Sequence, residues 1–110
     1  MTETNGQATL SRLFALIEGR KGKDPETSYT AQLLAGGVGK IAEKLGEEAI
    51  ETVLAAVTGE REALIHESAD LLYHLLVLLA ARGIRPEDVF AELEKREGRS
   101  GIEEKCARKR

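Results

Sequence analysis

The sequence predicts an all-α fold, a helical bundle of four to five helices. Composition is the first observation: the chain has no Trp, two Phe, two Tyr and two Pro, and its Ala, Leu, Glu and Lys residues favour helices over strands. Periodicity is the second, because apolar residues recur at helical spacing in segments that Gly or Pro separate. At 110 residues, the chain is expected to form one small domain.

The N-terminal part is expected to hold two short helices after a disordered start over residues 1–7. An amphipathic helix from Ala8 is indicated by apolar residues at i, i+3, i+4 and i+7 spacing, namely Leu10, Leu13, Phe14 and Ile17. A basic connection over residues 20–25 follows. Ser28 then opens a short helical turn, which ends at a glycine pair at positions 36 and 37, where left-handed backbone costs little.

Two long helices are expected to form the centre of the bundle. The first runs from about Val38 to Thr58, before Gly59. One face of it is traced at about 3.5-residue spacing by Val38, Ile41, Leu45, Ala49, Thr52 and Ala56. The second covers about residues 61–81 and is apolar on nearly every side from Leu71 onward. This second helix is therefore expected to be central.

The C-terminal part is expected to hold a last helix and a tail. Pro86 suits the first turn of a helix, since its missing N–H would have no partner there. After that helix the sequence becomes charged and is interrupted by glycines. These features divide the chain into an all-α domain over residues 8–96 and a charged tail over residues 97–110.

Composition also excludes several functions. The formal net charge of -3, with 42% hydrophobic and 32% charged residues, is ordinary for a soluble protein, and a nucleic-acid protein working by general electrostatics would be more basic. The longest apolar run, residues 75–81, is shorter than the about 20 residues that a membrane span needs, and no signal sequence is visible. Cys106 is the only cysteine, which excludes an internal disulfide. A cytoplasmic protein without nucleic-acid or membrane partners is expected.

Two acidic pairs at helical spacing carry the chemistry. They are Glu48-x-x-Glu51 and Glu67-x-x-Asp70, and each lies beside an apolar stripe, where carboxylates need a proton, a cation or a metal. Like charges three or four residues apart repel each other, and a bound cation would reverse that penalty. Antiparallel helices joined by a short turn at Gly59 can bring the pairs face to face. Four converging oxygen ligands indicate a hard divalent cation.

Several candidates have simpler interpretations. A single acidic pair is typical of a solvated helix face. On so apolar a helix, His74 is more typical of a hydrogen-bonded core histidine than of a ligand or base, and His66 is expected at the surface. By composition alone, the cations at positions 96, 99 and 105 form a charged tail. Gly36 to Lys40 ends in Gly-Lys but lacks the full spacing and the preceding strand of a phosphate-binding loop.

Three segments taken together resemble a known family. They are residues 40–51, residues 67–79 and residues 96–101, and in this order they are similar to the phosphoribosyl-ATP pyrophosphatases. That family belongs to the all-α nucleoside triphosphate pyrophosphohydrolases, whose signature is Glu-x-x-Glu, a gap, and Glu-x-x-Asp. The resemblance covers the chain from about Leu10 to Lys105.

The resemblance implies a reaction, a metal and site residues. The family uses magnesium to cleave the α–β phosphoanhydride of phosphoribosyl-ATP to phosphoribosyl-AMP and pyrophosphate, the second step of histidine biosynthesis. By this resemblance the metal ligands would be Glu48, Glu51, Glu67 and Asp70. Glu47 would be an additional ligand or base, and the choice between Glu47 and Glu48 as general base stays open. Lys44, and also Lys40, would hold phosphate oxygens from the same helix face, and Lys44 would be a catalytic residue together with Glu47 and Glu48.

The resemblance also implies substrate-binding residues and an oligomer. Similar proteins place the stretch that matches Ser28, Tyr29 and Thr30 near the substrate. Arg96, Arg99 and Lys105 would then hold the ribose phosphate that ordinary nucleotides lack. Members of the family are homodimers whose helices complete one bundle, and the apolar surface of residues 71–81 fits such pairing.

Two alternatives stay open at this point. One is a related house-cleaning hydrolase of deoxynucleoside or non-canonical triphosphates, against which the cationic segment from Arg96 to Lys105 argues. The other is a helical dimerisation module without enzymatic activity, whose acids only solvate one face. The two differ in whether the acids bind a metal, which replacement of Glu51 and Asp70 by Ala would reveal in a metal-dependent thermal shift.

Overall fold

The computed structural model describes residues 5–97 and is helical throughout its regular structure. Its helices are α1 (Gly6–Glu18), α2 (Tyr29–Gly36), α3 (Val38–Thr58), α4 (Arg61–Ala81) and α5 (Pro86–Arg96). No strand occurs in this part of the chain. The predicted all-α fold class is confirmed, and five helices match the upper end of the expected number.

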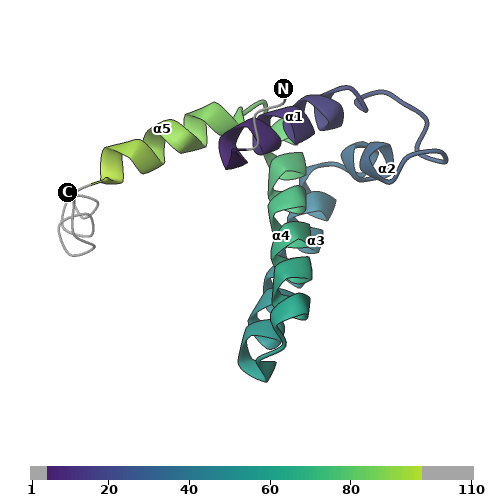
Figure 1. The fold of residues 1–110 in the computed structure, drawn as a ribbon. Coiled ribbons are helices and arrows are strands. Elements are labelled where there is room, and N and C mark those ends of the chain that lie inside the picture. The colour runs from purple at the N-terminus through teal and green to yellow at the C-terminus, as the bar shows by residue number, and fades with distance from the viewer. Residues whose placement is uncertain (1–4, 98–110) are drawn as a thin grey trace.

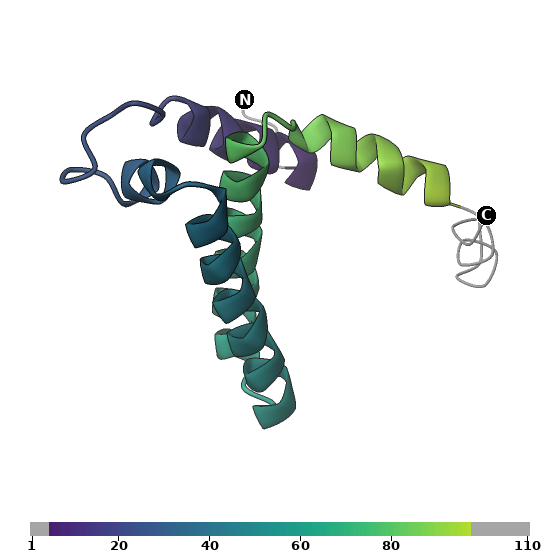
Figure 2. The same ribbon diagram turned by 180° about the vertical axis from the view of Figure 1, so that it is seen from behind.

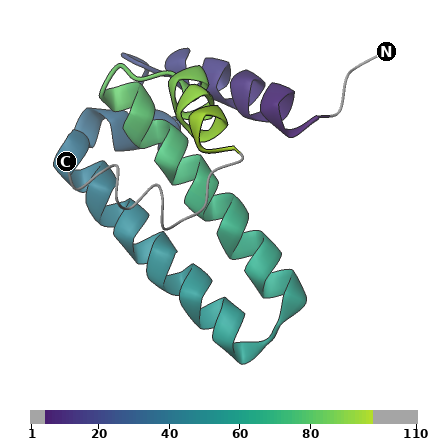
Figure 3. The ribbon, with the colours of Figure 1, turned by 90° about the vertical axis from the view of Figure 1, so that its left-hand side faces the viewer.

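The two long helices form an antiparallel hairpin (Figure 3). The chain reverses between them at Gly59, whose φ of +80° lies in the left-handed region that favours glycine. The other three helices gather at one end of this hairpin (Figures 1 and 2). The α3–α4 hairpin therefore has a covered end, near α1 and α2, and a free end at Gly59.

The hydrophobic core lies at the covered end. There α1 packs on α4, and α2 packs on both α3 and α4. The buried residues of this cluster are Phe14, Ile17, Leu33, Ile41, Leu76, Val77 and Ala80. The helical spacing of Phe14 and Ile17 points both side chains at the hairpin, as the sequence pattern predicts.

Local capping fixes where the short helices begin. The Asn5 side chain accepts a hydrogen bond from the Ala8 amide, so α1 begins two residues before the expected domain start at residue 8. Ser28 caps α2 in the same way, through the Ala31 amide. Pro86 is the first residue of α5, where its missing N–H costs nothing.

The free end of the hairpin exposes an apolar stripe of α3. The stripe, with i, i+3, i+4 and i+7 spacing, consists of Ile50, Val53, Leu54 and Val57, which are 62%, 60%, 55% and 75% exposed. The radius of gyration is 16.0 Å, larger than the about 13 Å typical of a compact domain of 100 residues. Within residues 5–97, this face of α3 is therefore left exposed.

Helix α4 is long and apolar enough to cross a membrane when judged by length and composition alone. Core helices of proteins outside membranes meet the same criterion. In this fold α4 packs against α1, α2 and α3. Its apolar character is thus partly accounted for by the core.

Candidate active site

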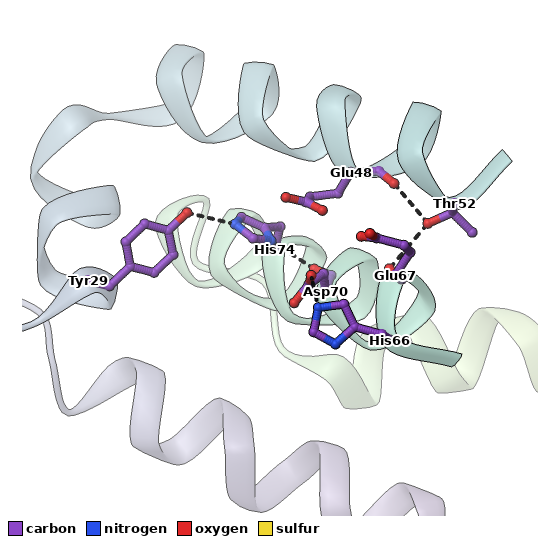
Figure 4. A network of polar contacts seen from close by, with 7 residues as sticks. All are labelled: Tyr29, Glu48, Thr52, His66, Glu67, Asp70 and His74. Atoms are coloured by element: carbon purple, nitrogen blue, oxygen red, sulfur yellow. Dashed lines mark hydrogen bonds and ion pairs between the residues drawn. The ribbon is translucent and has the colours of Figure 1, made fainter. Parts of the chain in front are cut away.

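Three carboxylates converge between the long helices, near the middle of the hairpin (Figure 4). Glu48 comes from α3, whereas Glu67 and Asp70 come from α4. Their nearest carboxylate oxygens all lie within 4.8 Å of one another, and each residue is half-buried. The antiparallel hairpin thus brings together acids that are about twenty residues apart in the chain, as the sequence predicts.

Thr52 holds the two acidic helix segments in register. Its hydroxyl oxygen lies 2.8 Å from the carbonyl oxygen of Glu48 and 3.2 Å from that of Glu67. One hydroxyl proton is therefore shared between a carbonyl of α3 and a carbonyl of α4. This contact limits sliding of one helix along the other, and so fixes the separation of the carboxylates.

Glu48 is the acid least satisfied by the protein. Its Oε2 atom is enclosed and has no hydrogen-bond partner within the described residues. Burial raises the pKa of Glu48 above its usual value, and the neighbouring Glu51 carboxyl and the charge of Asp70 raise it further, against a smaller opposing effect of His74. A bound divalent cation would partner this oxygen and neutralise the clustered charge, so the donor set fits a hard metal ion.

The other two predicted acids lie at the edge of this cluster. Glu51 is exposed and lies outside the three-acid group, although it is close enough to raise the Glu48 pKa. Glu47 is also exposed and accepts a hydrogen bond from Lys44, with 3.2 Å between Nζ and Oε1. This pairing raises the pKa of Lys44. The structure therefore gathers three of the four predicted ligands, with Glu51 adjacent.

A cavity of about 390 Å³ lies between α2 and α3 beside this edge. It is lined by Tyr29, Gln32, Leu33, Gly36, Lys40 and Lys44. Both predicted phosphate-binding lysines therefore contribute to the same cavity. Its mixture of ammonium groups, an aromatic ring and apolar surface suits a nucleotide, which carries phosphates and a planar base.

The Ser-Tyr-Thr stretch divides into different roles. Ser28 caps α2, and its hydroxyl oxygen accepts a hydrogen bond from the Ala31 amide. The Tyr29 hydroxyl lies 3.0 Å from Nε2 of His74 (Figure 4), and the Thr30 hydroxyl contacts the hydroxyl of Tyr73. Of the three, Tyr29 alone also lines the cavity with the lysines.

Of the three predicted ribose-phosphate contacts, the structure describes Arg96. It is the last residue of α5, which projects away from the hairpin (Figures 1 and 2). Its Nε lies 3.4 Å from a carboxylate oxygen of Glu92. Arg99 and Lys105 lie outside the described residues, so their binding role stays a prediction.

The two histidines behave as predicted. His74 is 4% exposed, and both of its ring nitrogens lie within hydrogen-bonding distance of a protein partner. His66 is exposed, and its Nε2 lies 3.4 Å from an Asp70 carboxylate oxygen. The sequence placed Thr52 on one face of α3 but did not predict its hydroxyl contact with α4, nor the place of Gln32 in the cavity, because both depend on a second helix. The position of Thr52 one helical turn after Glu48, on the same face of α3, is the signal that could have indicated its role.

The fold and the site together define an all-α protein that can hold a divalent cation between two antiparallel helices. Residues 10–97 match the profile of the family described as phosphoribosyl-ATP pyrophosphohydrolase. The chain belongs to this family, since the match covers most of its length.

Named relatives agree with this family. The phosphoribosyl-ATP pyrophosphatase of Parvibaculum lavamentivorans is 63% identical over 99 residues, which are 90% of this chain and 91% of the relative. The proteins of the same name from Azospirillum brasilense and Paracoccus denitrificans are 59% and 62% identical, over 93% and 91% of this chain and 92% and 93% of their own lengths. The similarity thus spans nearly the whole chain.

Proposed function

We propose that the chain hydrolyses phosphoribosyl-ATP to phosphoribosyl-AMP and pyrophosphate, the second step of histidine biosynthesis. The observation that carries this proposal is the enclosed, unpartnered oxygen of Glu48 within the three-acid cluster. A cavity lined by two lysines lies beside that cluster. Relatives of about 60% identity bear the name of this activity, which favours it over hydrolysis of deoxynucleoside or non-canonical triphosphates.

The cluster is proposed to hold Mg²⁺. Glu48, Glu67 and Asp70 would supply carboxylate oxygens, the ligands that magnesium prefers, and Glu51 would complete the set from the edge of the cluster. Bound there, the cation supplies charge stabilisation to the phosphate oxygens and the leaving pyrophosphate. The positive charge of a bound cation would also offset the repulsion among these acids.

The chain's own residues are proposed to place the triphosphate and to take up a proton. Lys40 and Lys44 would contact phosphate oxygens from the cavity between α2 and α3. Glu47 is our choice for the general base, because it is exposed and outside the three-acid cluster, whereas Glu48 would be occupied as a ligand. Glu47 would accept a proton from the water that cleaves the α–β phosphoanhydride, and pyrophosphate leaves.

The exposed stripe of α3 is proposed to pair with a second copy of the chain. Four apolar residues at helical spacing form one exposed face of α3, and contiguous exposed apolar patches mark interaction sites. A symmetric pairing would cover the same stripe on both copies. The apolar residues that need cover lie mainly on α3, rather than on the 71–81 segment that the sequence indicated. A homodimer in the cytoplasm, where a biosynthetic enzyme finds its nucleotide substrate, is the proposed working form.

One assay separates this function from its alternatives. Purified protein is incubated with phosphoribosyl-ATP, ATP and a set of deoxynucleoside triphosphates, each with magnesium and with EDTA, and pyrophosphate release is measured. We expect release from phosphoribosyl-ATP, with magnesium present, to exceed that from the other nucleotides. Equal or better use of a deoxynucleoside triphosphate would support the house-cleaning alternative, and no release from any would contradict both.

A matched pair of variants connects the activity to the cluster. Glu48→Gln removes the charge of the enclosed carboxylate, and we expect activity to fall about a hundredfold or more. Glu43→Gln makes the same chemical change on an exposed residue of α3, and we expect little effect. Equal activities for the two variants would mean that the acids only solvate the helix face.

A further inference from the structure

His74 makes two hydrogen bonds from a buried position. Its Nδ1 lies 2.8 Å from the main-chain carbonyl oxygen of Asp70, one helical turn earlier. Its Nε2 lies 3.0 Å from the Tyr29 hydroxyl, which belongs to α2. The ring is 4% exposed. One imidazole thus joins the backbone of an acid in the cluster to an aromatic side chain of the cavity (Figure 4).

The chemistry of the two partners fixes the protons in the neutral ring. A carbonyl oxygen can only accept a hydrogen bond, so Nδ1 carries the proton and donates to Asp70. Nε2 is then the acceptor, and the Tyr29 hydroxyl donates to it. A tyrosine hydroxyl is protonated near neutral pH, as this arrangement requires, and burial raises the pKa of Tyr29 further. The direction of both hydrogen bonds is therefore determined by the backbone of α4.

Tyr29 is held more firmly than its exposure suggests. The residue is 50% exposed, yet its hydroxyl is bonded to His74. Its ring also lies against Tyr73, with 6.4 Å between centroids and 19° between planes. The residue is the first of α2, whose start Ser28 caps. An exposed aromatic ring at a cavity wall is thus fixed before any ligand arrives.

We propose that His74 is a positioning residue, which fixes the Tyr29 ring as the wall of the cavity that takes the planar base of the nucleotide. This inference rests on the proposed function. The cavity offers the two lysines for phosphates and the Gln32 amide beside the ring for a polar base edge. A half-exposed aromatic ring binds a planar base by stacking, and a ring held in place loses less conformational entropy on binding.

Two substitutions of His74 separate its two hydrogen bonds. His74→Gln places an amide oxygen near the position of Nε2, so it keeps an acceptor for Tyr29. His74→Asn places an amide nitrogen near the position of Nδ1, so it keeps the bond to the Asp70 carbonyl and loses Tyr29. Tyr29→Phe removes the same contact from the other side. If His74 works through Tyr29, the Asn and Phe variants should resemble each other and the Gln variant should resemble the native chain.

The kinetic expectation is a change in KM. Since the ring contacts the unreacting base, its loss weakens substrate and transition state alike. We expect KM for phosphoribosyl-ATP to rise about threefold to tenfold in His74→Asn and in Tyr29→Phe, the worth of one hydrogen bond, with kcat within about twofold. The double variant that combines His74→Asn with Tyr29→Phe should have a KM no higher than that of Tyr29→Phe alone. The inference would be overturned if the increases in KM of His74→Asn and Tyr29→Phe added up in the double variant. It would also be overturned if His74→Asn and His74→Gln raised KM equally and in proportion to their loss of melting temperature.

A substrate-free measurement keeps this inference separate from the proposed function. Nitrogen-15 NMR of the metal-free native chain reports the tautomer of each of its two histidines, and the signals that His74→Asn removes belong to His74. We expect a protonated Nδ1, an unprotonated Nε2, and a shift of the Nε2 signal in Tyr29→Phe. A protonated Nε2 with bare Nδ1 would overturn the inference whatever the enzyme hydrolyses. The expected tautomer without hydrolysis of phosphoribosyl-ATP would contradict the proposed function alone.

Discussion

The two ends of the α3–α4 hairpin contain similar apolar residues, but these are buried at one end and exposed at the other. At the covered end, Ile41, Val77 and Ala80 are fully enclosed beneath α1 and α2. At the free end, Val53 and Val57 of the same α3 are mostly exposed. The difference is not one of residue type, since Val77 and Val57 are both valines. It arises because the three short helices within residues 5–97 cover only one end of the two long ones.

The acidic cluster lies between these two regions. Covered-end residues supply its neighbours His74 and Tyr29, while Thr52 connects the helices where the apolar stripe begins. The site therefore adjoins the packed core on one side and the exposed stripe of α3 on the other. Covering the exposed stripe would stabilise the hairpin segment that carries the carboxylates.

The largest expected effect comes from charging the exposed stripe. Ile50→Glu combined with Val57→Glu would place two carboxylates in the proposed interface between copies. Each apolar side chain buried there contributes about 1.5–3 kcal/mol, so we expect the double variant to be monomeric and to lose most of its activity. Sedimentation velocity at several concentrations gives the oligomeric state, and pyrophosphate release gives the activity.

The covered end provides a matched control. Leu16 of α1 is 62% exposed, the same fraction as Ile50, but it lies outside the stripe. Leu16→Glu should leave the oligomeric state unchanged. If the native chain sediments as a monomer, or if the double variant still forms dimers, the stripe is not the interface.

Much of the fold follows from sequence because its signals are local. The long helices, their glycine turn, the cap at Ser28 and the first-turn proline of α5 all depend on residues that are neighbours in the chain. The free end could not be assigned in this way. Periodicity traced the face of α3 that holds Ile41 and Thr52, but it did not indicate whether another part of the chain covers the face of Ile50 and Val57.

The candidate site, like the fold, could be predicted where it depends on local spacing and not where it depends on packing between helices. Spacing and charge indicated Glu48, Glu67 and Asp70, because an antiparallel hairpin with a short turn leaves few ways for these acids to face each other. The exposure of Glu51 and the bond between Tyr29 and His74 depend on packing among α2, α3 and α4. Contacts of that kind leave no periodic trace in the sequence.

A smaller expected effect is the destabilisation of the folded, metal-free protein by the clustered carboxylates. The folded-state pKa of Glu48 is raised above its usual 4.5, so its protonated form favours folding. That contribution is fully present below pH 4.5 and is lost as the pH rises through the raised pKa. We therefore expect Glu48→Gln to melt at a higher temperature than the native chain at pH 7 in EDTA, with the difference shrinking towards pH 4.5.

Magnesium should reverse the order of these two melting temperatures. Native protein is expected to gain stability as magnesium is added, while Glu48→Gln gains little, because the cation stabilises only the state that binds it. Differential scanning fluorimetry over a magnesium series measures both. Equal shifts for Glu48→Gln and the exposed control Glu43→Gln would count against a metal site at the cluster.

The smallest expected effect lies at the covered end, where Ser11 of α1 contacts α5. Its hydroxyl donates to a Glu87 carboxylate oxygen at 2.8 Å, and this bond is the main reason that the pKa of Glu87 lies below its usual 4.5. The stabilisation is present above pH 4.5 and is lost as the pH falls through the lowered pKa. Ser11→Ala should therefore lower the melting temperature slightly at pH 7, and less so at pH 4. A pH-independent difference would assign the loss to packing, and the double variant with Glu87→Gln tests this, since it should show no added loss.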